Sequence, residues 1–163
     1  RTRNQTVFGV GSPRARRLFV GEAPGAEEDK QGMPFVGRAG ALLSAMLFSI
    51  GLSREDVYIA NVLKCRPPNN RDPLGREVRE CSPFLHQQIS WVQPEIIVAM
   101  GRFAAQALLE TDQSLGQLRG HSHKYKINEL PLVVTYHPAY LLRSPSAKGK
   151  SWEDLTLAQS IVD

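Results

Sequence analysis

Four short runs of the chain are almost continuously apolar and rich in β-branched residues. They are RLFVG (17–21), DVYIANVLK (56–64), EIIVAMG (95–101) and LPLVVTYHP (130–138). Unbroken apolar character, in place of strict alternation, is typical of strands that are buried on both faces. The pattern therefore predicts four central strands.

Helical periodicity fills the segments between these runs. Apolar residues recur at helical spacing over 38–50 and 77–92, and a shorter helix is expected over 102–110. Ser151 is expected to cap a last helix. Strands that alternate with helices indicate the α/β class, here a three-layer α/β/α arrangement around a central, mainly parallel four-stranded sheet. We expect residues 1–163 to form a single domain.

Residues that could take part in binding or catalysis follow the predicted strands. Glu22 comes after the first strand, and Asn61 and Cys65 come at the second. Gly101 follows the third strand, and His137 follows the fourth. Because ligands of parallel sheets bind at the carboxyl ends of the strands, we expect a site where these residues meet.

Composition narrows the class of protein. A chain of 163 residues is long enough for one sizeable core. The sequence shows no apolar run of membrane-span length and no secretion leader, and two cysteines do not indicate a disulfide scaffold. We therefore expect a cytoplasmic protein that does not contact a membrane. The net charge of +4 is compatible with an anionic partner without requiring one.

The segment GEAPGAEEDKQGMPFVGRAG (21–40) combines glycines with four carboxylates. Pro24 and the acidic run interrupt the dinucleotide-binding pattern, and the lysine and hydroxyl of a P-loop are missing. A nucleotide-cofactor site is therefore not favoured. Taken alone, the acidic run is best explained as a solvated surface loop with glycine turns.

Four motifs follow one another in a specific order, each beside a predicted strand. They are GEAPG, PFVGRAG, NVLKCRPP and HPAYLLR. This set resembles the uracil-DNA glycosylase superfamily, and within it the family 4 type, which carries an iron–sulfur cluster. The resemblance covers nearly the whole chain. It implies a base-excision repair enzyme that hydrolyses the N-glycosidic bond of uracil in DNA and leaves an abasic site.

The resemblance implies a pocket for a uracil that has been flipped out of the DNA stack. Phe35 would stack on the base, and the Asn61 amide would match its O4 and N3–H edge and mismatch cytosine. Gly21 and Asn70 are further candidates for the uracil site. Taken singly, Phe35 is equally well explained as a core aromatic, and Asn61 as a strand-end residue bound to backbone.

The same resemblance suggests the catalytic groups. His137 would donate a hydrogen bond to uracil O2 and stabilise the leaving anion, although a histidine satisfied by backbone in a turn is the alternative. Ala23 stands where other branches carry a water-positioning aspartate, so its backbone would hold the water. Glu22 would orient that water or oppose the sugar cation. Glu27, Glu28 and Asp29 are further candidates, of which Glu28 is favoured.

Two basic segments follow the strands that carry Asn61 and His137, and both are candidates for DNA binding. In the superfamily the loop after the histidine motif enters the minor groove near the flipped base. Leu141, Leu142 and Arg143 are therefore the candidates for a wedge that inserts into the DNA there. Two ordinary basic surface loops are the alternative. The expected DNA-binding residues are Lys64, Arg66, Arg71, Leu141, Leu142, Arg143 and Lys148.

Cys65 and Cys81 are, on their own, typical of buried free thiols. The resemblance makes them two of the four ligands of a structural 4Fe-4S cluster that would brace the loop over 66–71 against DNA. The family pattern places the other pair just ahead of the opening Arg1, where this sequence has none. We therefore expect an N-terminally truncated chain with two ligands upstream.

Other functions remain open at this point. A superfamily branch traps DNA covalently through a histidine in an inserted loop, but NVLKCRPPNNRDPLGRE is short and has no histidine. A non-catalytic nucleic-acid-binding module of the same fold is a second alternative, and a hydrolase of free nucleotides is a third. The expected partner is uracil-containing DNA, bound by a monomer.

Overall fold

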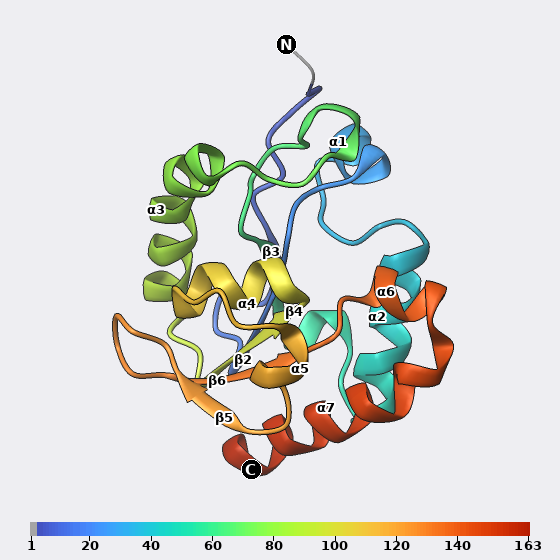
Figure 1. Cartoon of the computed structure of the whole chain (residues 1–163), viewed down its shortest axis with the longest axis vertical. Coiled ribbons are helices and arrows are strands. Elements are labelled where there is room, and N and C mark those ends of the chain that lie inside the picture. The colour runs from blue at the N-terminus through green and yellow to red at the C-terminus, as the bar shows by residue number, and fades with distance from the viewer. Residues whose placement is uncertain (1–2) are drawn as a thin grey trace.

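A computed structural model describes residues 3–163 and shows a six-stranded sheet with helices on both faces (Figure 1). The four inner strands run parallel, and a short antiparallel strand pairs at each edge. The predicted parallel sheet is confirmed as the centre, and the two edge strands are additional. From edge to edge the order is β1 (Val10–Gly11), β3 (Tyr58–Asn61), β2 (Arg17–Gly21), β4 (Ile96–Met100), β6 (Pro131–Thr135) and β5 (Ser122–Lys124).

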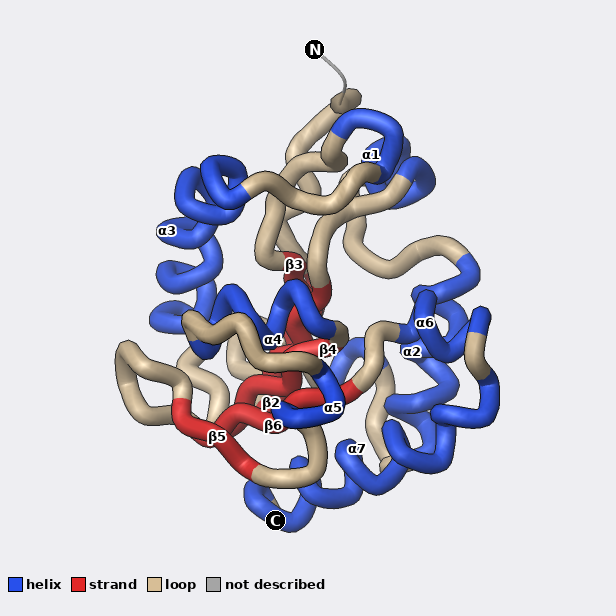
Figure 2. The backbone as a smooth tube through the Cα atoms, viewed as in Figure 1, coloured by secondary structure: helices blue, strands red, loops and turns tan. Residues whose placement is uncertain are grey.

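Seven α-helices lie within residues 3–163, and the longest connection between these helices and the strands runs from β3 to α3 (Figure 2). In this part of the chain, every helix is too short or too polar to cross a lipid bilayer. Single turns of 3-10 helix occur at Arg54–Asp56, Pro68–Asn70 and Pro145–Ala147. The helices are α1 (Ala26–Gln31), α2 (Arg38–Ser49), α3 (Gly75–Val92), α4 (Arg102–Leu109), α5 (Leu115–Leu118), α6 (Pro138–Arg143) and α7 (Lys148–Val162).

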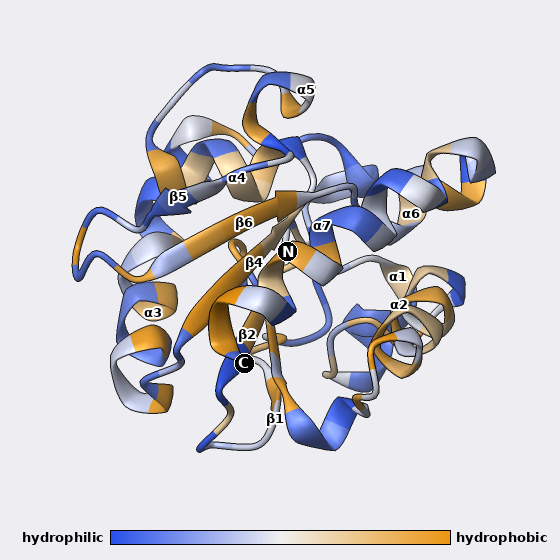
Figure 3. Ribbon diagram, turned by 90° about the horizontal axis from the view of Figure 1, so that it is seen from below, coloured by the Kyte–Doolittle hydropathy of each residue, from blue (hydrophilic) through white to orange (hydrophobic). Residues whose placement is uncertain are grey.

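Alternate residues of each inner strand face opposite layers, which explains the unbroken apolar runs. In β2, Leu18 and Val20 pack with the core of α3 and α4, whereas Phe19 packs with the core of α2 and α7. Figure 3 shows the hydrophobic strands between these two groups of helices. Burial on both faces fixes the strands, and their carboxyl ends carry the loops of the candidate site.

Two local predictions are wrong. The last helix begins at Lys148, so Ser151 is inside it, where its hydroxyl accepts a hydrogen bond from Thr135 at 2.9 Å. The acidic run is not a plain surface loop, because it contains α1. The Glu28 side chain accepts a bond from the Gly25 amide at the start of α1, and acidic residues are favourable in a first helical turn.

Candidate active site

A cavity of about 190 Å³ lies at the carboxyl ends of the inner strands. It brings together five residues that the sequence assigned to the site, although they come from four separate segments of the chain. Its walls are formed by Ala23, Gly25, Glu28, Phe35, Ala39, Asn61, His137 and Ala139.

Asn61 is the last residue of β3, and its side chain is buried, with 2% of the residue exposed. Its Oδ1 is the one buried side-chain oxygen or nitrogen among residues 3–163 that lacks a hydrogen-bond partner. Leaving such an atom unpaired costs about 1–3 kcal/mol, which a ligand with an N–H donor would recover. The cavity is therefore built to receive a hydrogen-bond donor at Asn61.

Gly21 leaves the space that this arrangement needs. A Cβ at this position would lie 2.6 Å from Asn61 Oδ1 and 2.7 Å from the ring of Phe35. Both distances are shorter than non-bonded contacts allow. Gly21 therefore acts by being small, and it allows the amide and the aromatic ring to meet at one wall of the cavity.

Phe35 adopts a left-handed backbone conformation, with a φ of 55°. An aromatic residue rarely takes this conformation, which costs energy unless the surroundings hold it. The backbone of α2 approaches closely, since a Cβ on Gly40 would lie 1.9 Å from the Phe35 carbonyl oxygen. The Phe35 ring stacks with the ring of His137, with centroids 5.4 Å apart. The strained turn thus presents an aromatic surface beside the histidine.

His137 caps the start of α6, and its Nδ1 accepts a hydrogen bond from the backbone amide of Ala139 at 3.0 Å. Because Nδ1 is an acceptor, the neutral ring carries its proton on Nε2. Burial lowers the pKa of His137 to about 4, the charge of Arg143 lowers it as well, and Glu28 opposes the shift. At neutral pH, His137 is therefore an uncharged ring with one N–H donor.

Glu28 lines the cavity, but its carboxylate mainly holds backbone. One oxygen accepts from the Gly25 amide at 3.0 Å. The other accepts from the amides of Val36 and Gly37 at 2.9 and 3.1 Å. These bonds tie the loop after β2 to the segment directly after Phe35, so Glu28 stabilises the strained turn that carries the aromatic ring.

The Glu28→Gln substitution is expected to loosen this turn. An amide cannot accept at both positions, and its NH₂ group would face a backbone N–H. The free energy of unfolding should fall by about 1–3 kcal/mol. Chemical denaturation measures this, and Glu27→Gln is the matched control because Glu27 makes only an exposed contact with Lys30. Equal stability of the two variants would contradict the role of Glu28 as a brace.

The other acidic candidates do not line the cavity. Burial and the neighbouring Asp72 raise the pKa of Glu22, and Arg102 opposes the shift. Asp29 is buried and accepts from the backbone amides of Asn4 and Gln5, so it anchors the N-terminal segment. The structure thus assigns Asp29 a structural contact.

The basic loop after β3 differs from the expectation at three residues. Lys64 is buried and makes internal hydrogen bonds, so it is not available to DNA, and burial lowers its pKa to about 8. Arg71 makes a bidentate ion pair with Glu77 at 2.7 and 2.9 Å, which lowers the pKa of Glu77 to about 2. Arg66 donates to Asn70 at 2.8 Å, and this asparagine is exposed and does not line the cavity.

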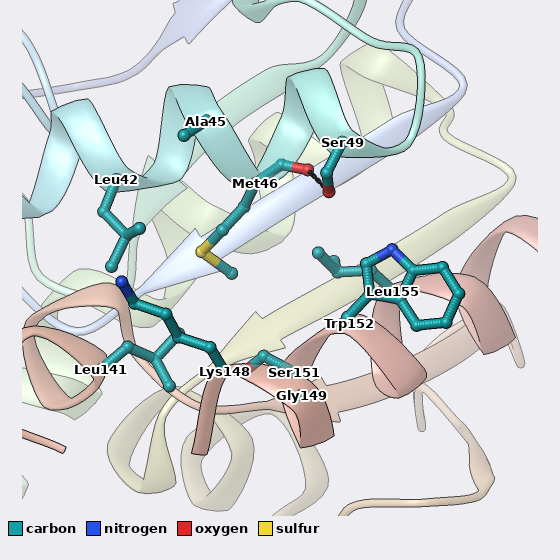
Figure 4. Close-up of a pocket in the computed structure, with 10 residues that line it drawn as sticks. All are labelled: Leu42, Ala45, Met46, Ser49, Leu141, Lys148, Gly149, Ser151, Trp152 and Leu155. Carbon is teal, nitrogen blue, oxygen red and sulfur yellow. Dashed lines mark hydrogen bonds between the residues drawn. The ribbon is translucent and has the colours of Figure 1, made fainter. Parts of the chain in front are cut away.

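Leu141 is fully buried and cannot be a surface wedge, which corrects that prediction. It lines a second cavity of about 350 Å³ between α2 and α7, together with Met46 and Trp152 (Figure 4). Leu142 is half-buried, and Arg143 and Lys148 are exposed. These three residues retain the surface position that a DNA contact requires.

Cys65 and Cys81 are half-buried free thiols. Arg3 donates a hydrogen bond to the sulfur of Cys65, so the N-terminal segment passes beside this residue. Within the part of the chain that the structure describes, no group of three or more His, Cys, Asp or Glu side chains could hold a metal ion. The described residues therefore supply at most two cysteine ligands to a cluster.

A model of the uracil DNA glycosylase superfamily matches residues 8–156, which include every residue that lines the first cavity. The chain belongs to this superfamily. It is 46% identical over 160 residues to the type-4 uracil-DNA glycosylase of Archaeoglobus fulgidus, covering 94% of this chain and 80% of that protein. The match to the type-4 enzyme of Sulfurisphaera tokodaii is 47% over 159 residues, covering 93% and 72%. The type-4 enzyme of Thermotoga maritima is 44% identical over 163 residues, covering 98% and 84%.

The sequence interpretation missed three small residues of the site. Gly25, Ala39 and Ala139 line the cavity. Gly101, which the sequence analysis placed after the third strand, has a φ of 94°, and a Cβ there would lie 3.0 Å from the Cβ of His137. The only available signal for Gly25, Ala39 and Ala139 was that they stand inside the four motifs, because smallness in itself marks no chemistry.

Proposed function

We propose that this protein is a uracil-DNA glycosylase of the type-4 kind, which hydrolyses the N-glycosidic bond of a flipped-out uracil and leaves an abasic site. One observation carries the proposal: Asn61, whose Oδ1 has no hydrogen-bond partner, and His137, whose uncharged ring keeps one N–H donor, line the same small cavity. The type-4 enzymes that the chain resembles support it.

Uracil presents a hydrogen-bonding edge that complements the Asn61 amide in this cavity. Asn61 Oδ1 would accept from uracil N3–H, while Nδ2 would donate to O4. Cytosine presents an acceptor at N3 and an amino group at C4, so both contacts would be mismatched. Stacking on Phe35 would add about 1–3 kcal/mol, a contribution that is similar for every base. Asn61 therefore provides the selectivity, and Phe35 provides general affinity.

Bond cleavage moves the electron pair of the C1′–N1 bond onto uracil, and negative charge develops on O2. The Nε2–H of His137 would donate to this oxygen, and its neutral state means that the donor keeps its own proton. Water then adds to C1′ of the sugar, and its released proton leaves through solvent. Ala23 has no basic side-chain atom, so its backbone would hold this water, with Glu22 or a remaining lone pair of Glu28 as further acceptors.

The pH dependence should reflect the lowered pKa of His137. The uncharged ring is the form that caps α6 through Nδ1, and it dominates above the pKa of about 4. The rate of uracil release should therefore show no step from His137 between about pH 5 and pH 8, and should fall as the pH drops through about 4. Single-turnover rates across this range test the prediction. A step near pH 6.5 that vanishes in a His137 variant would contradict it.

DNA would be held by the groups that remain at the surface. Arg66, Leu142, Arg143 and Lys148 are the proposed contacts, with Leu142 and Arg143 entering the space that the flipped base leaves. Arg71 is a weaker candidate because Glu77 already pairs with it. Action as a monomer stays a prediction.

A 4Fe-4S cluster is part of the proposal. Cys65 and Cys81 would supply two thiolates, and two further ligands would have to come from outside the described residues. Arg3 donates a hydrogen bond to Cys65, so the N-terminal segment passes beside this sulfur. When bound, the cluster would cross-link segments of the chain. Iron and acid-labile sulfide assays on the purified protein test this.

We also propose a cytoplasmic location, where cysteines are usually kept from forming disulfides.

The experiment that tests the proposed function is uracil release from a labelled single-stranded oligonucleotide, detected as alkali-sensitive abasic sites. Cleavage at uracil is the expected result. Binding of DNA without cleavage would favour a non-catalytic module of the same fold. A protein–DNA adduct that survives denaturation would favour the branch that traps DNA covalently. Strong competition by free uridine nucleotides would favour a nucleotide hydrolase.

A further inference from the structure

Lys64 has an unusual environment for a lysine. It lies three residues after Asn61, and only 2% of it is exposed. Its ammonium group donates to the carbonyl oxygen of Asn61 at 2.7 Å, to the side-chain oxygen of Gln88 at 2.5 Å and to the carbonyl oxygen of Phe8 at 3.3 Å. These three bonds use the full donor capacity of the group.

All three acceptors are uncharged. Among residues 3–163 no carboxylate forms an ion pair with Lys64. Burial is the largest effect on the pKa of Lys64 and lowers it, while Cys81 opposes the shift. A buried ammonium whose hydrogen-bond acceptors are all uncharged is costly, and a well-packed apolar side chain of similar volume is often at least as stable in such a place. The stability of the fold is therefore a poor explanation for a lysine here, and the contact with Asn61 needs its own account.

The peptide group after Asn61 is held from both sides. Its N–H, which belongs to Val62, donates to the carbonyl oxygen of Gly21 at 2.9 Å. Its carbonyl oxygen accepts from Lys64. The side chain of Asn61, in contrast, has no described hydrogen-bond partner at Oδ1. The direction in which the amide points therefore depends on how firmly this peptide plane is fixed.

We propose that Lys64 is a positioning residue for base recognition, whose buried ammonium fixes the peptide after Asn61 and so aims the Asn61 amide into the cavity. The proposal rests on the proposed function of that cavity. Gln88 of α3 completes the arrangement, since its Nε2 donates to the Phe8 carbonyl at 2.7 Å while its oxygen accepts from the ammonium. The N-terminal segment, α3 and the end of β3 thus share one buried polar network.

The Lys64→Met substitution tests the proposal, because methionine fills similar space without the three donors. The inhibition constant of free uracil should rise about 10–100-fold, since small displacements of a recognition group have effects of this size. The affinity for DNA that carries an abasic site should stay at the parent value. The control is Leu108→Ala in α4, which disturbs a buried core position that takes no part in these hydrogen bonds and should lower the melting temperature without changing inhibition by uracil.

A second variant separates this effect from any change at the neighbouring Cys65. Gln88→Leu removes one acceptor of the ammonium and leaves residues 64 and 65 intact. Inhibition by uracil should weaken in the same direction by a smaller factor, at an iron content equal to that of the parent. Parent-level inhibition in both variants would overturn the proposal. Failure of the proposed function would look different, because the parent protein itself would then release no uracil.

Discussion

Replacing His137 with alanine should slow uracil release about 10²–10³-fold, which is the usual cost of removing one donor to a developing oxyanion. The affinity for abasic DNA should change little, because the ring faces the cavity that holds the base. Single-turnover rates on a uracil-containing oligonucleotide measure the effect. His121→Ala is the control, since His121 is exposed and its ring lies at a tilt beside that of His123. A parent-level rate for His137→Ala would remove the centre of the mechanism.

A third variant separates the two roles of His137, which caps α6 through Nδ1 and provides the donor at Nε2. Asparagine is among the best residues at a helix N-terminus, so His137→Asn should keep the cap. Its shorter side chain does not reach the position of Nε2. We expect His137→Asn to keep most of the stability and to lose activity as severely as His137→Ala. Recovery of activity in His137→Asn would mean that the cap, and not the donor, matters.

The Asn61→Asp substitution should change which base is accepted. A carboxylate offers acceptors only, so it would repel uracil O4 and suit the amino group of cytosine. The ratio of uracil to cytosine release should fall by at least about 10²-fold, because a site built to hydrogen-bond one group strongly rejects an analogue that lacks it. Matched oligonucleotides that differ in one base give this ratio.

Asn128→Asp is the control for that experiment. Asn128 is exposed in the loop before β6 and bonds only to the nearby backbone of Leu130. It should keep the parent ratio. A parent ratio in Asn61→Asp as well would show that another group distinguishes the two bases, and the unpaired oxygen of Asn61 would then have no part in recognition.

The central sheet could be predicted from the sequence because burial on both faces leaves a direct mark, an unbroken apolar run. The positions of Asn61 and His137 followed from the same runs, since each residue stands at a strand end. In contrast, α1 carries no apolar period, and its start depends on bonds from Glu28 to backbone amides. Every residue except proline has a backbone amide, so no sequence pattern predicts which amides a carboxylate will bind.

The electrostatic details were equally hidden. Lys64 looked like one more basic residue of a basic loop, and its burial depends on Gln88, which is 24 positions away. The proton position on His137 depends on one amide of the following helix. Leu141 lies in a motif that suggested DNA contact, but its side chain is buried and lines the second cavity together with residues of α2 and α7. Each of these facts requires the tertiary arrangement of the chain.

The most direct test of the account is the single-turnover rate of the parent protein on two single-stranded oligonucleotides that differ only in one base, uracil or cytosine. The arrangement of Phe35, Asn61 and His137 predicts abasic sites at uracil and an unchanged cytosine strand over the same time. Equal release of both bases, or release of neither, would contradict the claim that this cavity recognises and excises uracil.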